Sequence, residues 1–217
     1  MEINNYDFLA YIASKGILMI LSTGMADKKE VTNAVNIIEQ MGNQQLIILH
    51  CISIYPAQPK TINLKNISWL QEEFPNYPIG FSDHTLGTEV ACGAIALGAC
   101  VVEKHFTLDK SKMGMDNNMA IEPDEMTKLI KDCQNVFVAL GTKERIVLDI
   151  EYKQRENMRR SVVAATNLSK GMVLAKNDLT LKRPGNGIPA DKIDSIVGRE
   201  LLNDIQADTL ILEMDLK

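Results

Sequence analysis

Four short apolar runs, spaced along the first half of the sequence, most constrain how this chain of 217 residues can fold. The runs cover residues 17–22, 46–51, 79–82 and 100–105. Segments with the spacing or composition of helices follow them at residues 27–41, 64–74, 88–97 and 123–140. Because the runs are apolar without alternation, they are typical of strands that are covered on both faces, as in parallel sheets. The sequence therefore predicts four consecutive βα units.

Two architectures are built from such units, a doubly wound sheet and a (β/α)₈ barrel. No G-x-G-x-x-G motif follows any of the four runs, which argues against a dinucleotide-binding domain. In both architectures, ligands bind at the carboxyl ends of the strands. The polar residues at these ends are Ser22, Thr23, Ser53, Tyr55, Ser82, Asp83, His84, Glu103, Lys104 and His105. We therefore expect the functional site at this edge of the sheet.

After Ser161 the pattern of apolar runs and turn residues in the sequence changes. Short β-type runs at 162–165 and 179–182 alternate with turns, and residues 183–187 (RPGNG) form a loop whose glycines permit close approach of a ligand. Residues 143–160 suit a connector helix. This stretch combines the basic residues Lys153, Arg155, Arg159 and Arg160 with Glu151 and Glu156, as is typical of a solvated helix face. We expect one domain over residues 1–158 and a small all-β domain over 159–217.

Charge and composition narrow the class of protein. The chain has 23 basic and 28 acidic residues, a net charge of −5, which argues against a nucleic-acid partner. No apolar stretch reaches the roughly 18 residues of a membrane-spanning helix, so no membrane partner is expected. The four cysteines (Cys51, Cys92, Cys100 and Cys133) lack C-x-x-C spacing and lie in apolar runs. They predict buried, reduced thiols and a cytoplasmic location.

His84 and His105 follow neighbouring predicted strands, so their imidazoles could chelate one divalent ion. The alternative is two separately hydrogen-bonded histidines at a barrel rim. Four carboxylates surround the same rim: Asp83, Glu103, Asp109 and Asp116. The simple alternative to a functional role is a surface position or a helix cap, which we expect for Asp109, whereas Asp116 lies on a loop that could reach a substrate. Lys104 is expected in the layer between strand and helix, as a salt-bridge partner or as a catalytic group. His50 is expected to be a core histidine.

Several segments of this sequence resemble signature motifs of the sialic acid synthases. The segments are 20–25 (ILSTGM), 50–56 (HCISIYP), 80–87 (GFSDHTLG) and 103–110 (EKHFTLDK), and 182–188 (KRPGNGI) resembles the antifreeze-like SAF domain of the same family. They cover essentially the whole chain in the family's order. The resemblance implies the carboxyl-terminal half of a TIM (β/α)₈ barrel followed by a β-clip SAF domain.

The resemblance also implies a reaction and a set of site residues. The reaction is the condensation of phosphoenolpyruvate with N-acetylmannosamine or a related amino sugar, which gives N-acetylneuraminate or a related nonulosonic acid plus phosphate. It implies Mn²⁺, with Mg²⁺ or Co²⁺ as substitutes, bound by His84 and His105. The other implied site residues are Ser22, Ser53 and Ser82 for phosphoenolpyruvate, Tyr55 and Asp116 for the sugar, and Arg183, which reaches the partner subunit's barrel in a homodimer.

The chain also departs from the family pattern. Ser53 replaces a common Asn, and Met115 and Asn117 stand where Pro and His are common, which suggests a legionaminic- or pseudaminic-type substrate. Four upstream βα units of the family have no counterpart here. We therefore expect little synthase activity from this chain without a separate amino-terminal half. The alternative is a non-catalytic remnant whose SAF domain binds sugar or assists assembly.

Overall fold

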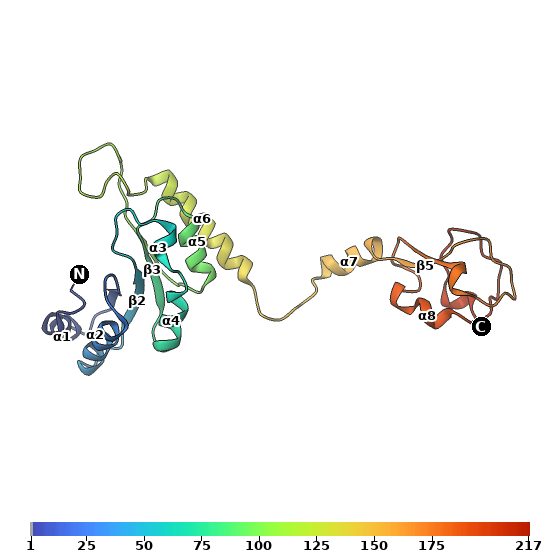
Figure 1. Ribbon diagram of the computed structural model, residues 1–217, viewed down its shortest axis with the longest axis horizontal. Coiled ribbons are helices and arrows are strands. Elements are labelled where there is room, and N and C mark those ends of the chain that lie inside the picture. The colour runs from blue at the N-terminus through green and yellow to red at the C-terminus, as the bar shows by residue number, and fades with distance from the viewer. Residues whose placement is uncertain (1) are drawn as a thin grey trace. The chain divides into compact units, whose positions relative to one another are not determined.

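The computed structural model describes residues 2–217 and divides them into two compact units (Figure 1). The first unit ends at Thr142 and the second covers Lys143–Lys217. Helix α7 (Asp149–Met158), which the sequence predicts as a connector, therefore belongs to the second unit. The sequence instead assigns this helix to the first domain, with a boundary after residue 158. Among residues 2–217, no helix combines the length and apolarity needed to cross a bilayer.

The first unit is built on one parallel sheet of four strands. The strands are β1 (Met19–Ser22), β2 (Leu46–Cys51), β3 (Ile79–Asp83) and β4 (Val102–Lys104), and they pair in the order β1-β2-β3-β4. Each strand pairs with the next one along the chain, as in a barrel. The register of the last pair sets Ser82 opposite Glu103 and Asp83 opposite Lys104. The sheet is the curled half of a (β/α)₈ barrel, which confirms the predicted fold class.

Helices follow the strands, as the apolar periodicity predicts. They are α2 (Lys28–Gln40), α4 (Asn66–Glu73), α5 (Glu89–Ala96) and α6 (Pro123–Leu140), with short helices α1 (Tyr6–Ala13) before β1 and α3 (Pro59–Ile62) after β2. Asp27 begins α2 with a capping box that includes Glu30. Pro123 occupies the first turn of α6, where its missing N–H costs nothing. Local chemistry thus fixes where these helices begin.

The core of the first unit lies between the sheet and the helices. Ile38 of α2, Ile48 of β2, Ile67 of α4 and Phe81 of β3 are completely buried there. A smaller cluster joins Ala91 of α5 to α6. This packing is what orders the strand ends that carry the polar residues.

The second unit is small and rich in turns. Strands β5 (Ser161–Ala164) and β6 (Leu179–Lys182) form an antiparallel pair, and isolated bridges join the remaining short segments. Three 3₁₀ turns, η1 (Lys176–Asp178), η2 (Ala190–Lys192) and η3 (Glu213–Asp215), and the short α8 (Ile193–Ile196) complete it. Its own core includes Val162, Leu174, Ile196 and Ile211. The predicted all-β character of residues 159–217 is confirmed in its main features.

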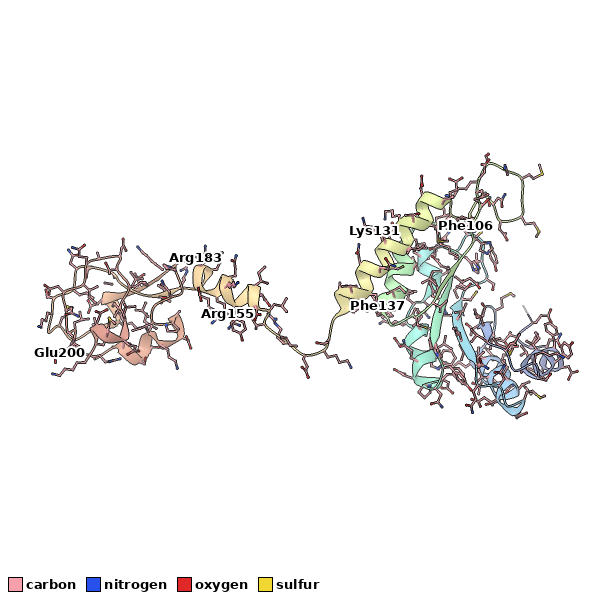
Figure 2. All side chains as sticks on the ribbon, turned by 180° about the vertical axis from the view of Figure 1, so that it is seen from behind. Phe106, Lys131, Phe137, Arg155, Arg183 and Glu200 are labelled. Atoms are coloured by element: carbon pink, nitrogen blue, oxygen red, sulfur yellow. The ribbon has the colours of Figure 1, made fainter. Side chains whose placement is uncertain are left out.

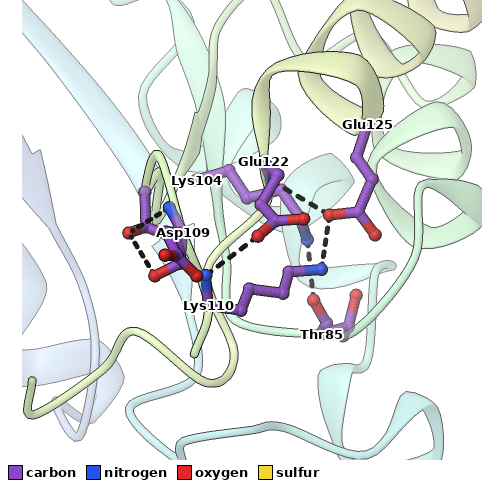
Figure 3. Close-up of polar contacts among 7 residues, drawn as sticks. Thr85, Lys104, Asp109, Lys110, Glu122 and Glu125 are labelled. Atoms are coloured by element: carbon purple, nitrogen blue, oxygen red, sulfur yellow. Dashed lines mark hydrogen bonds and ion pairs between the residues drawn. The ribbon is translucent and has the colours of Figure 1, made fainter. Parts of the chain in front are cut away.

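Asp83 and Lys104 form a buried ion pair behind the sheet, so Asp83 lies away from the rim that the other carboxylates occupy. The Lys104 Nζ lies 2.7 Å from the Asp83 Oδ2, and the two side chains are 4% and 0% exposed. Nζ also donates to the Thr85 carbonyl at 2.7 Å (Figure 3). Asp83 accepts from the Thr85 backbone and hydroxyl as well. The pair lies in the layer between strand and helix, which is where Lys104 is expected.

Replacing Lys104 with Met tests how much this pair contributes. The substitution leaves the Asp83 carboxylate buried without its cation, so we expect the free energy of unfolding to fall by about 3–5 kcal/mol. Lys110, which pairs with the half-exposed Glu125 (Figure 3), is a matched control. Lys110→Met should cost less than about 1 kcal/mol. Urea unfolding followed by circular dichroism measures both, and equal losses would contradict a structural role for the buried pair.

Candidate functional site

His84 and His105 lie next to each other at the carboxyl ends of β3 and β4. The strand register, continued by one residue, sets the two histidines opposite each other. Their ring centroids are 5.2 Å apart, with 64° between the ring planes. Two imidazoles that share one ion, each with a metal–nitrogen bond of about 2.0–2.1 Å, have centroids at about this separation. The pair therefore fits a shared divalent ion.

The His84 ring is held by the backbone in a state suited to metal binding. Its Nδ1 lies 2.9 Å from the Ile52 carbonyl oxygen, which can only accept, so Nδ1 carries the proton and Nε2 keeps its lone pair. A metal-binding histidine usually has this kind of second hydrogen bond. Burial lowers the pKa of His84, but the contacts with the Cys51 thiol and the Ile52 carbonyl raise it by more.

A carboxylate from the loop that follows β4 lies near His105. Its Nδ1 lies 3.7 Å from the Asp116 Oδ2, and both side chains are partly exposed. Asp116 therefore lies beside the histidine pair, as the sequence predicts for a residue that could face a substrate. Within residues 2–217, no third His, Cys, Asp or Glu joins the two imidazoles in a metal-binding group. Any remaining positions on a shared ion would fall to water or to substrate oxygens.

A cavity of about 240 Å³ opens beside the histidines at the same end of the sheet. It is lined by Ile3, Ser22, Gly24, Cys51, Ser53, Tyr55, Ser82, His84, Glu103 and His105. Three of the four strands and the loops that follow them supply hydroxyl groups to its wall. The cavity thus brings together six of the eight residues proposed from the sequence, and Asp116 adjoins it.

The wall of this cavity is packed closely at Gly24. A Cβ added at Gly24 would lie 2.1 Å from the Ser53 Oγ and 3.1 Å from the Cys51 Sγ, so only glycine leaves Ser53 in place. Burial raises the pKa of the Cys51 thiol, but hydrogen bonds with His84, Ser82 and Ser53 lower it by more. The Cys51 Sγ lies 3.8 Å from the Ser53 Oγ and 4.0 Å from the His84 Nδ1, so the three side chains are in polar contact in the wall of the cavity.

Tyr55 covers the two histidines. Its ring centroid lies 4.2 Å from that of His84 and 5.7 Å from that of His105. Its side chain is half exposed, with its ring against the imidazoles. A tyrosine placed this way can contact a ligand that occupies the cavity.

Glu103 is a cavity residue that the sequence places at the expected edge of the sheet but to which it assigns no role in the site. Its Oε1 accepts a hydrogen bond of 2.7 Å from the Ser82 hydroxyl, and its side chain lines the cavity. The signal was available, because Glu103 and His105 are two residues apart on one strand and so point to the same face. Glu103 fixes the direction of one of the hydroxyls proposed for substrate binding.

Arg183 belongs to the second unit, at the start of the RPGNG loop. Its Nε donates to the Met158 carbonyl at 3.1 Å, at the end of α7, and the side chain is exposed (Figure 2). The loop is tied to the chain around β5, since Ser161 Oγ donates to the Pro184 carbonyl at 2.8 Å and accepts from the Gly187 N–H at 2.9 Å. The guanidinium of Arg183 thus projects from a loop that hydrogen bonds hold in place.

Other expectations from the sequence have mixed outcomes. His50 is a core residue, 3% exposed, with Nε2 2.7 Å from the Ile62 carbonyl, and burial lowers its pKa. Asp109 makes a local turn, with its carboxylate accepting from Ser111. The cysteines are only partly as expected, since Cys51 alone is buried and Cys100 is exposed. Cys100 lies two residues before β4, the last strand at an open edge of the sheet, where its side chain is exposed.

Comparisons with known proteins identify the family to which each part of the chain is similar. Residues 1–145 match the NeuB family and residues 159–217 match the SAF domain. The chain is 41% identical to N,N'-diacetyllegionaminic acid synthase of Legionella pneumophila, with 97% of the chain and 60% of that protein covered. It is 35% identical to human N-acetylneuraminate-9-phosphate synthase, with 98% of the chain and 59% of that protein covered.

A solved structure shows the same arrangement of elements. The spore coat polysaccharide biosynthesis protein SpsE of Bacillus subtilis superposes with a TM-score of 0.62 at 32% identity, over 100% of this chain and 65% of that one. The chain thus spans about three fifths of the length of the relatives that it matches. With its first 145 residues matched by the family model and its last 59 by the SAF domain, the chain belongs to the NeuB family.

Proposed function

We propose that this chain forms the sugar-acid synthase site of a nonulosonic acid synthase. The reaction joins phosphoenolpyruvate to an N-acetylated amino sugar, either N-acetylmannosamine or the precursor of a legionaminic- or pseudaminic-type acid. The observation that supports it most is the histidine pair beside a cavity lined with hydroxyls. Relatives named as legionaminic, pseudaminic and N-acetylneuraminate-9-phosphate synthases support the class of product. A cytoplasmic location and a homodimer are parts of the same proposal.

The chemistry requires a new carbon–carbon bond and the loss of phosphate. Carbon 3 of phosphoenolpyruvate attacks the aldehyde carbon of the open-chain sugar, water adds at carbon 2, and phosphate leaves to give the 2-keto acid. A divalent ion, Mn²⁺ in first place, would be held by His84 and His105 and would polarise the aldehyde oxygen as a Lewis acid. Mg²⁺ or Co²⁺ would serve as substitutes.

The chain's own residues orient the two substrates. The hydroxyls of Ser22 and Ser53 would donate to the oxygens of phosphoenolpyruvate. The Ser82 hydroxyl donates to Glu103, so it would have to turn away from that carboxylate to join them. Tyr55 and Asp116 lie beside the histidines, on the side open to the sugar. Arg183 of a second copy would bind sugar oxygens with paired hydrogen bonds from its planar guanidinium.

Full activity requires four further βα units, whether a separate chain or a longer polypeptide supplies them. A barrel closes only with all of its strands, and the sheet described here has free edges at β1 and β4. Ile20 of β1 is half exposed at one edge, next to a groove of about 400 Å³ between α1 and β1. Closure would cover this edge and exclude water from the site.

Titration with Mn²⁺ tests the metal site. We expect His105→Ala and His84→Ala each to weaken binding of Mn²⁺ by at least about 10-fold, because each removes one of two protein ligands. Asp109→Asn, on the loop after β4 but outside the cavity, is the matched control and should bind as the wild type does. His105 is partly exposed, so its variant is the one expected to fold normally. Equal affinity in all four proteins would remove the metal assignment.

Steady-state turnover tests the need for further strands. The chain of 217 residues, supplied with phosphoenolpyruvate, N-acetylmannosamine and Mn²⁺, should release phosphate no faster than a sample without sugar. Adding a polypeptide with the four preceding βα units of a relative should restore sugar-dependent release of phosphate. Sustained turnover by the chain without that addition would contradict the proposal that the half-barrel is insufficient.

A further inference from the structure

The second unit contains a cavity of its own, of about 600 Å³, between α7 and the segment that follows the RPGNG loop. Six polar side chains line it: Tyr152, Arg155, Glu156, Arg159, Arg160 and Asp191. Figure 2 shows where α7 and the loop meet, with Arg155 on the helix and Arg183 on the loop. This cavity lies wholly within one compact unit and is distinct from the histidine cavity.

The three arginines of this cavity are not in direct ion pairs, although Glu156 and Asp191 line the same cavity. None of the nine ion pairs found in the part of the chain that the structure describes includes Arg155, Arg159 or Arg160. The carboxyl end of α7 favours cations, but a helix dipole is equivalent to only about half a unit charge. Arg155 and Arg159 are also four residues apart, a spacing at which like charges oppose the helix. Arg159 and Arg160 are exposed and Arg155 is half-buried, as on the solvated helix face that the sequence predicts, and a bound anion would balance their charge.

The backbone holds this wall in place. The Gly185 N–H donates to the Glu156 carbonyl at 2.7 Å, which ties the RPGNG loop to α7. A Cβ added at Gly185 would lie 2.7 Å from both the Arg155 carbonyl oxygen and the Arg159 Cβ. The helix and the loop are thus in close contact, and the arginines project from a fixed support.

The other lining groups indicate what kind of anion fits. Three arginines face two carboxylates, Glu156 and Asp191, so the lining carries a net charge of +1. The carboxylates can accept hydrogen bonds from hydroxyl groups, of which a sugar offers several and inorganic phosphate at neutral pH only one or two. The Tyr152 ring, with the Arg155 guanidinium 4.5 Å from its centroid, adds an apolar surface. A singly charged acid with many hydroxyls matches all three features.

We propose that the cavity between α7 and residues 185–191 binds a carboxylated sugar, with its carboxylate on the arginines and its hydroxyls on Glu156 and Asp191. A guanidinium pairs with a carboxylate through two parallel hydrogen bonds, which gives the arginines their selectivity. The choice of a sugar acid rests on the proposed function, whose product is such a molecule. The second unit then binds the sugar acid with residues other than those that line the histidine cavity of the same copy.

Calorimetric titration of the 217-residue chain with N-acetylneuraminate tests this site. We expect Arg155→Gln and Arg159→Gln each to raise the dissociation constant by about 10-fold or more, since each removes a charge-assisted pair. Lys153→Gln, on the same helix but outside the cavity, is the matched control and should change the dissociation constant less than twofold. N-acetylmannosamine, which has no carboxylate, should not bind in an arginine-dependent way. Circular dichroism checks that the exposed-residue variants fold.

His84→Ala separates this proposal from the proposed function. Arginine-dependent binding that persists in His84→Ala supports a second site. Three results would overturn it. If His84→Ala loses affinity for N-acetylneuraminate and the arginine variants do not, the sugar acid binds in the histidine cavity. Equal loss in Lys153→Gln would indicate unspecific charge attraction. Arginine-dependent binding of inorganic phosphate without binding of N-acetylneuraminate would refute the assigned class of ligand.

Discussion

The in-register parallel pairing of β3 and β4 is the constraint on which the rest of the first unit depends. It sets Ser82 opposite Glu103, Asp83 opposite Lys104 and, one residue further, His84 opposite His105. Side chains alternate between the two faces of a strand, so the first and third of these pairs face the cavity and the second faces the helices. The buried ion pair between Asp83 and Lys104 holds the strand ends from behind, while the two imidazoles meet in front.

The sequence predicts the elements well wherever the apolar pattern is strong. Residues 46–51 and 123–140 match β2 and α6, and residues 179–182 match β6. Helix α1 was missed, because it precedes the first βα unit and has no strand before it to mark it. The boundary between the domains is harder to predict, because α7 carries no buried residue and reads as a free connector. Its contacts with the RPGNG loop join residues that are distant in sequence.

The candidate site, too, is partly predictable from the sequence and partly not. The histidines, the serines and Tyr55 were predicted from motifs at strand ends, and the structure places them around one cavity. A carboxylate beside a histidine suggests the rim, but the alternation of side chains along a strand sends Asp83 to the opposite face. Glu103 was undervalued because its partner, Ser82, is on another strand. Contacts between strands depend on register, which a single sequence does not supply.

The central claim is that His84 and His105 share one metal ion. The most direct test is electron spin-echo spectroscopy of the chain, labelled with ¹⁵N-histidine and loaded with Mn²⁺. The spacing of the two rings predicts magnetic coupling of one manganese ion to two histidine nitrogens, and to one in His105→Ala. A spectrum without coupling to any histidine nitrogen would contradict a shared ion and, with it, this account of the site.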